Sequence, residues 1–228
     1  MGHMIEYARA DGTPVTGYLA MPAAAESAPG VVVIHEAWGL ASPKSNTCEV
    51  ADRLAAAGYR ALAPDLYRGK QATTREEMGP LMKSLDWSGA VADIAATAEH
   101  LKGHHVEGGK VAVLGFCLGG ALTILSAVNL ALVDAAVCFY GVPPAAAADP
   151  ALIKVPLLGH FATHDDWVTA AVIEGLEDQL TAGGVSHRLH VYEAHHAFMN
   201  DKRPEVYDAV AATLAWERSL EFLASNLR

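Results

Sequence analysis

An alternation of short apolar runs with segments of helical periodicity constrains the fold of this chain more than any other feature. Two runs, "VVVI" at 31–34 and "VAVL" at 111–114, are apolar at every position rather than at every second one. Strands of this kind are typical of a parallel sheet that helices cover on both faces. The sequence therefore predicts an α/β fold with a mostly parallel central sheet. Its helices are expected over 44–57, 88–101, 118–130 and 168–182, with a closing helix from Pro204.

The two ends of the chain show patterns of their own. Residues 5–8 and 15–19 alternate apolar and polar side chains and are separated by "DGTP", which predicts an antiparallel hairpin at the sheet edge. In the last helix, four apolar residues fall near helical spacing and are expected to face the sheet. These are Val206, Val210, Leu214 and Leu220.

Composition limits the partners of the chain. With 52% hydrophobic and 18% charged residues, the sequence has ample material for one large core, so residues 1–228 are expected to form a single domain. The formal net charge of −10 does not suit a nucleic acid or an anionic membrane surface. A small-molecule partner is therefore expected, and no cofactor or metal.

Cysteine usage and the first residues indicate a cytoplasmic protein. The three cysteines, Cys48, Cys117 and Cys138, do not suffice for a disulfide framework. The opening "MGHMIEYARADG" has neither a basic leader nor an apolar stretch of signal-peptide length. Residues 111–133 lack charge over about the length of a membrane span, but their glycines divide them into a strand and a helix. No membrane is expected as a partner.

Cys117 stands in a motif that can present a nucleophile. The segment "GFCLG" at 115–119 is a G-x-C-x-G variant of the nucleophile elbow, and it follows a strand and opens a helix. The sharp turn needs glycines because side chains two residues before and after the nucleophile would collide with the helix or strand. The helix N-terminus favours the thiolate there. Alternatively, Cys117 is a small buried core residue.

An acid and a histidine follow in the order that hydrolases built on this kind of sheet use. A cysteine nucleophile needs a base, and the base needs a carboxylate to orient it. Asp165 or Asp166 follows the strand-like "VPLLGHFA", and His196 follows "LHVYE". Either aspartate could instead cap the helix predicted from residue 168.

Six segments carry a resemblance that covers nearly the whole chain: "VVVIHEAWGL", "APDLY", "GFCLGGA", "HFATHDDWV", "YEAHHAFMN" and "AWERSLEFL". On them the sequence is identified as a member of the dienelactone hydrolase family, within the α/β-hydrolase superfamily. The resemblance implies an α/β-hydrolase fold and a triad of Cys117, Asp165 and His196. Asp165 is preferred to Asp166 because the family's aspartate precedes two residues and then a valine. His195 stands where the family usually has glycine.

The resemblance also implies a reaction, hydrolysis of a carboxylic ester or lactone through the cysteine. Glu36 is expected to meet the nucleophile in the resting site and to take part in forming the thiolate when substrate arrives. The backbone N–H groups of Leu118 and Ala37 are expected to form the oxyanion hole.

Substrate-binding residues are expected where the family clamps a carboxylate with two arginines. The second of these positions, four residues after the histidine, is Asn200 here, and Arg68 in "DLYRGK" lies close to the first. Arg203 in "NDKRPEVY" either substitutes for the missing partner or is a solvated charge before the closing helix. Aromatic side chains near strand ends are expected to line an apolar pocket or to pack in the core. These are Trp38, Tyr140 and Phe198.

Two other functions compete with hydrolysis. One is a metal site, for which His160, His164, His195 and His196 would have to converge, although their spacing is not a strong ligand signature. The other is a hydrolase scaffold that only binds a ligand, with Cys117 as a redox-sensitive residue. A separate pair, residues 104–105 (both His), is expected in a surface loop.

Overall fold

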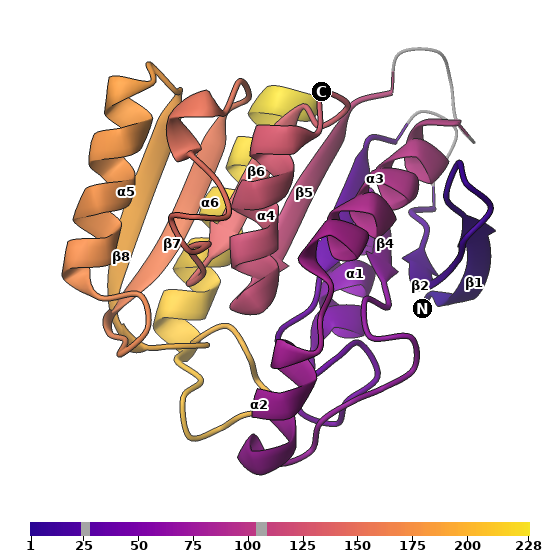
Figure 1. The fold of residues 1–228 in the computed structure, drawn as a ribbon, viewed down its shortest axis with the longest axis horizontal. Coiled ribbons are helices and arrows are strands. Elements are labelled where there is room, and N and C mark those ends of the chain that lie inside the picture. The colour runs from indigo at the N-terminus through magenta and orange to yellow at the C-terminus, as the bar shows by residue number, and fades with distance from the viewer. Residues whose placement is uncertain (24–27, 104–108) are drawn as a thin grey trace.

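The computed structural model describes residues 1–23, 28–103 and 109–228, and its strands form one eight-stranded sheet (Figure 1). The order across the sheet is β1-β2-β4-β3-β5-β6-β7-β8. Strands β3 to β8 run parallel, whereas β1 and β2 are antiparallel to their neighbours, which confirms the predicted sheet and edge hairpin. The strands are β1 (His3–Ala8), β2 (Pro14–Ala20), β3 (Gly30–Ile34), β4 (Arg60–Pro64), β5 (Val111–Phe116), β6 (Ala135–Phe139), β7 (Leu157–His164) and β8 (His187–His195).

Helices cover both faces of the sheet, as its fully apolar strands require. In Figure 1, α3, α4 and α5 lie in front of the sheet and α1 and α6 behind it, and each layer has its own apolar core. The histidine pair at 104–105 lies outside the described residues. The helices are α1 (Thr47–Ala56), α2 (Arg75–Lys83), α3 (Trp87–Gly103), α4 (Leu118–Asn129), α5 (Ala170–Ala182) and α6 (Ala209–Leu227), with a short 3-10 turn at Pro150–Leu152.

The closing helix differs from its prediction in start and in buried face. It begins at Ala209 instead of Pro204, because the side chain of Asp208 caps it by accepting from the amide of Ala211 at 2.8 Å. Of the apolar residues expected on the sheet, Val210 is 80% exposed and Leu214 is also exposed. Small side chains face the sheet instead, since they let the helix axis approach closely: Ala211, Ala212, Ala215 and Ser219, followed by Leu223 and Leu227.

Helix α2 was not predicted, because its sequence is polar and none of its residues is buried. A capping box starts it: Thr74 accepts from the amide of Glu77, and the Glu77 carboxylate accepts from the amide of Thr74. This "TxxE" spacing is the signal in the sequence that could have located the helix. In Figure 1 the helix extends beyond the end of the sheet.

Strands β3, β5, β6, β7 and β8 are neighbours and parallel, so their carboxyl ends lie along one edge of the sheet. The residues directly after these strands therefore meet there, as in other open α/β sheets. None of the helices in the described ranges is long and apolar enough to cross a membrane.

Candidate active site

Cys117 occupies a strained turn between β5 and α4. Its φ is +55° and its ψ is −115°, a conformation that side chains other than glycine seldom adopt. The backbone holds it there, because its amide donates to the carbonyl of Phe139 at 3.0 Å and its carbonyl accepts from Ala121 at 3.1 Å. Cys117 is 9% exposed and lines a pocket at the sheet edge. The turn therefore directs a buried thiol into a cavity.

The glycines of the elbow are required by close approach, as predicted. A Cβ on Gly115 would lie 2.1 Å from the carbonyl oxygen of Gly119, and one on Gly119 would lie 2.3 Å from that of Ile34. Gly120 and Gly141 are equally confined by backbone atoms. Because backbone cannot give way at these distances, only glycine lets α4 pack this closely against the sheet.

The register of β7 and β8 brings Asp165 and His196 together. The two strands pair in parallel up to His164 opposite His195, so the residue after each lies beside the other. Nδ1 of His196 donates to Oδ2 of Asp165 at 2.6 Å. Oδ1 of Asp165 accepts from the amides of Trp167 and Val168 at 2.8 and 3.0 Å. Asp166 is exposed and is not part of this network.

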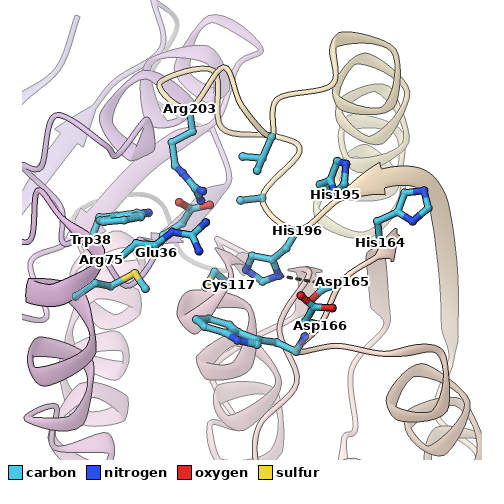
Figure 2. Close-up of a pocket in the computed structure, with 14 residues that line it drawn as sticks. Glu36, Trp38, Arg75, Cys117, His164, Asp165, Asp166, His195, His196 and Arg203 are labelled. Carbon is cyan, nitrogen blue, oxygen red and sulfur yellow. Dashed lines mark hydrogen bonds and ion pairs between the residues drawn. The ribbon is translucent and has the colours of Figure 1, made fainter.

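The other ring nitrogen of His196 faces the thiol. Nε2 is buried and makes no hydrogen bond of good geometry, and Cys117 is the polar side chain beside it (Figure 2). Burial lowers the pKa of His196, but the hydrogen bond to Asp165 and the proximity of Cys117 outweigh it and raise the pKa to about 10. The hydrogen bonds to Asp165 in turn lower its pKa in spite of burial. The ring is thus stabilised as an imidazolium once it has taken the thiol proton, because it then lies between the Asp165 carboxylate and the Cys117 thiolate.

Glu36, which follows β3, is held by two other residues of the site. Its Oε1 accepts from the Tyr140 hydroxyl at 3.2 Å, and its Oε2 accepts from the Asn200 amide at 2.7 Å. Within the described parts of the chain, Cys117 is not a hydrogen-bond partner of Glu36. Burial raises the pKa of Glu36, against the opposing effects of Asn200, His196 and Arg203. Asn200, at the position of the expected arginine, thus anchors this carboxylate.

The two backbone amides expected to form the oxyanion hole belong to residues that directly follow Cys117 and Glu36, which both line the pocket. Leu118 is the first residue of α4, and Ala37 directly follows Glu36. Within the part of the chain that the structure describes, neither amide donates a hydrogen bond. Helix geometry explains this for Leu118, because the first amides of a helix have no partner inside it. In this part of the chain both amides therefore keep a free N–H.

The pocket beside these groups has a volume of about 230 Å³ and contains two arginines (Figure 2). Arg75 from α2 and Arg203 from the loop after β8 both extend toward Glu36. Arg203 also pairs with Glu205 at 3.0 Å and lies 5.3 Å from the ring of Trp38, a third residue of the lining. Arg75 was missed by sequence reasoning, because its helix was missed.

Three residues expected to bind substrate do not line this pocket. Tyr140 is buried and lines a different cavity beside Cys117. The guanidinium of Arg68 turns toward α3 and pairs with Asp93 at 2.8 Å, so it lies in a different surface cavity. Phe198 is fully buried and packs edge-on against Tyr140, with ring centroids 5.4 Å apart. It is a core residue, since it packs within the apolar cluster that also contains residues of α1 and α6.

The four histidines of the alternative metal site do not converge. His160 is buried and bonds Tyr192 and Ser219. His164 pairs with Glu193 at 2.6 Å, whereas His196 pairs with Asp165. His195 lies at the rim of the pocket (Figure 2). Within the described ranges, no three histidine, cysteine, aspartate or glutamate side chains are grouped so as to hold a metal ion.

The sheet order, the elbow and the groups at the strand ends define an α/β-hydrolase. Comparison with known proteins places the chain more narrowly. The profile of the dienelactone hydrolase family matches residues 15–227, and the chain therefore belongs to this family of carboxylic ester hydrolases.

Two curated relatives and one solved structure illustrate the similarity. The chain is 38% identical to protein usf of Aquifex pyrophilus over 233 residues, with 100% of both chains covered. It is 31% identical to carboxymethylenebutenolidase 1 of Cupriavidus pinatubonensis over 96% of this chain and 95% of the relative. The dienelactone hydrolase-like promiscuous phosphotriesterase P91 from metagenomic libraries has a TM-score of 0.83 and 25% identity, over 100% of this chain and 99% of its own.

Proposed function

We propose that this protein hydrolyses a carboxylic ester or lactone with Cys117 as nucleophile, His196 as base and acid, and Asp165 as the group that orients the histidine. The observation that carries the proposal is the position of the His196 ring, bonded to Asp165 through Nδ1 and facing Cys117 through Nε2. This is the relation that a nucleophile, its base and an orienting carboxylate require.

The reaction takes place in two steps. His196 accepts the thiol proton, and the sulfur of Cys117 attacks the carbonyl carbon, while the amides of Leu118 and Ala37 stabilise the oxyanion. The carbon–oxygen bond breaks as His196 returns the proton to the leaving alkoxide. Water, deprotonated by His196, then cleaves the thioester and regenerates the thiol. The raised pKa of His196 suits this cycle, because the ring holds the proton until the leaving group needs it.

Glu36 controls the nucleophile in this proposal. It lines the same pocket as Cys117, and a carboxylate beside a thiolate is unfavourable. Glu36 therefore disfavours the thiolate in the free enzyme, and an ester that enters the pocket separates the two groups. Tyr140 and Asn200 fix the carboxylate at its position.

The substrate carries an anionic group. Arg75 and Arg203 supply two guanidinium groups to the pocket, and among the residues the structure describes Arg75 has no ion-pair partner. Guanidinium groups bind carboxylates well because their donors match both oxygens. The name of the Cupriavidus relative, carboxymethylenebutenolidase, also refers to a lactone with a carboxymethylene substituent. Asn200 stands where the family's usual clamp has an arginine. We therefore expect the substrate carboxylate to bind at a different position in the pocket.

Substitution of the thiol tests the proposal. Cys117→Ala and His196→Ala should each lower kcat/KM on lactones and aryl esters by at least about a thousandfold. Cys48→Ala is the matched control, because Cys48 lies in α1 away from the pocket, and it should keep full activity. Full activity in either of the first two variants would exclude the mechanism.

Alkylation distinguishes the enzyme from a redox-sensitive binding protein with the same fold. Iodoacetamide should label Cys117 and abolish turnover in parallel. A tightly bound ester should slow both the labelling and the loss of turnover. Labelling of Cys117 without loss of turnover would favour the binding protein.

A further inference from the structure

A second pocket, apolar in character, opens on the other side of Cys117. Its volume is about 180 Å³. Its walls come from α2, the starts of α3 and α4, and the loops after β6 and β7. The side chains that line it include Met82, Trp87, Leu118, Val142 and Val168.

Cys117 and Trp167 line both pockets and so form the boundary between them. Trp167 is 55% exposed, and its ring lies 5.3 Å from that of His196. The charged groups are confined to one side, because His196, Arg75 and Arg203 line only the first pocket.

The position of His196 decides which part of a substrate occupies which pocket. The leaving oxygen must take its proton from His196, so the leaving group lies in the first pocket with the arginines. The acyl group extends to the opposite side of the attacked carbon, into the apolar pocket. We propose, on the basis of the function proposed above, that this second pocket binds the acyl part of the substrate, and that this part is a short aliphatic chain.

The two half-reactions fit this division. Cys117 sulfur bonds to the carbonyl carbon, the ester carbon–oxygen bond breaks, and the alcohol leaves through the first pocket with the proton of His196. The acyl chain stays in the apolar pocket as the thioester. Water then enters from the vacated first pocket, where His196 can accept its proton, and releases the carboxylic acid.

Pocket size limits the chain length. Pockets for drug-sized ligands have about 300–1,000 Å³, so a pocket of about 180 Å³ suits only a few carbon atoms. Each methylene that moves from water into an apolar pocket contributes enough to raise kcat/KM about fourfold. Activity should therefore rise from the acetyl to the butanoyl ester and fall once the chain exceeds the pocket.

A chain-length series tests the acyl pocket. Esters of one aryl alcohol with acetyl, butanoyl, hexanoyl and octanoyl groups are compared on the wild-type protein and on Val142→Trp, which fills the pocket from a half-buried position. Val142→Trp should lower kcat/KM at least tenfold more on the butanoyl ester than on the acetyl ester. Val172→Trp, an equal change on the exposed surface of α5, is the control and should leave the profile unchanged.

Trp87→Ala provides a second variant that enlarges the pocket instead. It should move the optimum to longer chains by about two carbon atoms, which a merely destabilised protein would not do. An unchanged chain-length profile in both variants would overturn the acyl pocket. Failure of the proposed function would show itself differently, because Cys117→Ala would then still hydrolyse the acetyl ester.

Discussion

Replacement of Asp165 by asparagine should reverse the direction of the hydrogen bond that orients His196. In the native site Oδ1 accepts from two backbone amides and Oδ2 accepts from the ring. The asparagine carbonyl must take the place of Oδ1, because the amides can only donate. Its NH2 group then faces Nδ1 of His196 and donates to it. The proton of the neutral ring moves to Nε2, which can no longer accept from Cys117.

The expected decrease in kcat follows from the loss of His196 as the base. The corresponding change in a serine triad lowers kcat about 10⁴-fold, which corresponds to about 5.4 kcal/mol of transition-state stabilisation. We expect Asp165→Asn to lower kcat by about 10³- to 10⁴-fold with little change in KM. The fold should persist, because an asparagine oxygen keeps the hydrogen bonds to Trp167 and Val168.

The same variant changes how stability depends on pH. The pKa of His196 lies above its ordinary value of 6.5, at about 10, so the protonated ring stabilises the native fold fully below about pH 6.5. This contribution is lost as the pH rises toward 10. Asp165→Asn removes the carboxylate that helps to raise the pKa of His196, so this pKa should fall. The native fold of the variant should then lose less stability between about pH 6.5 and 10 than the wild type does.

Steady-state kinetics and an NMR titration of the His196 ring check both effects. Asp166→Asn is the matched control, since Asp166 is exposed and should affect kcat less than about tenfold. The reasoning fails if Asp165→Asn retains more than a tenth of wild-type kcat, or if the His196 titration is unchanged.

Three further predictions concern the surroundings of the triad. Asn200→Leu removes a donor to the buried carboxylate of Glu36, so the pKa of Glu36 should rise further; an unchanged infrared titration of this carboxylate would contradict this. Gly119→Ala should lower the free energy of unfolding by about 3 kcal/mol in urea titrations, whereas Gly79→Ala, which meets open space, should not lower it. Arg75→Gln should raise KM about tenfold for anionic esters only, and Arg68→Gln should leave KM unchanged; equal effects would refute the pocket assignment.

Helices α2 and α6 show where apolar periodicity fails as a predictor: α2 was not predicted at all, and the buried face of α6 was predicted wrongly. An amphipathic pattern identifies a buried face only when large apolar residues supply it, and α6 packs through alanines instead. Helix α2 buries no residue, so apolar periodicity gave no signal and only its capping box marked it. Its absence from the prediction concealed Arg75. Arg68, which was chosen from the family's arginine position, pairs with Asp93 instead.

Local sequence determined the features whose causes are local. Fully apolar strands required a covered parallel sheet. Gly115 required a tight strand-to-helix turn, because the backbone that confines it belongs to Gly119, only four residues further on. Contacts between distant segments were decided by the tertiary structure. The register of β7 and β8 joins Asp165 to His196, and the loop after β8 brings Asn200 to Glu36 across 164 positions. Such pairings depend on how whole elements pack, because a side chain reaches only a few ångströms and the fold alone decides what lies within that distance.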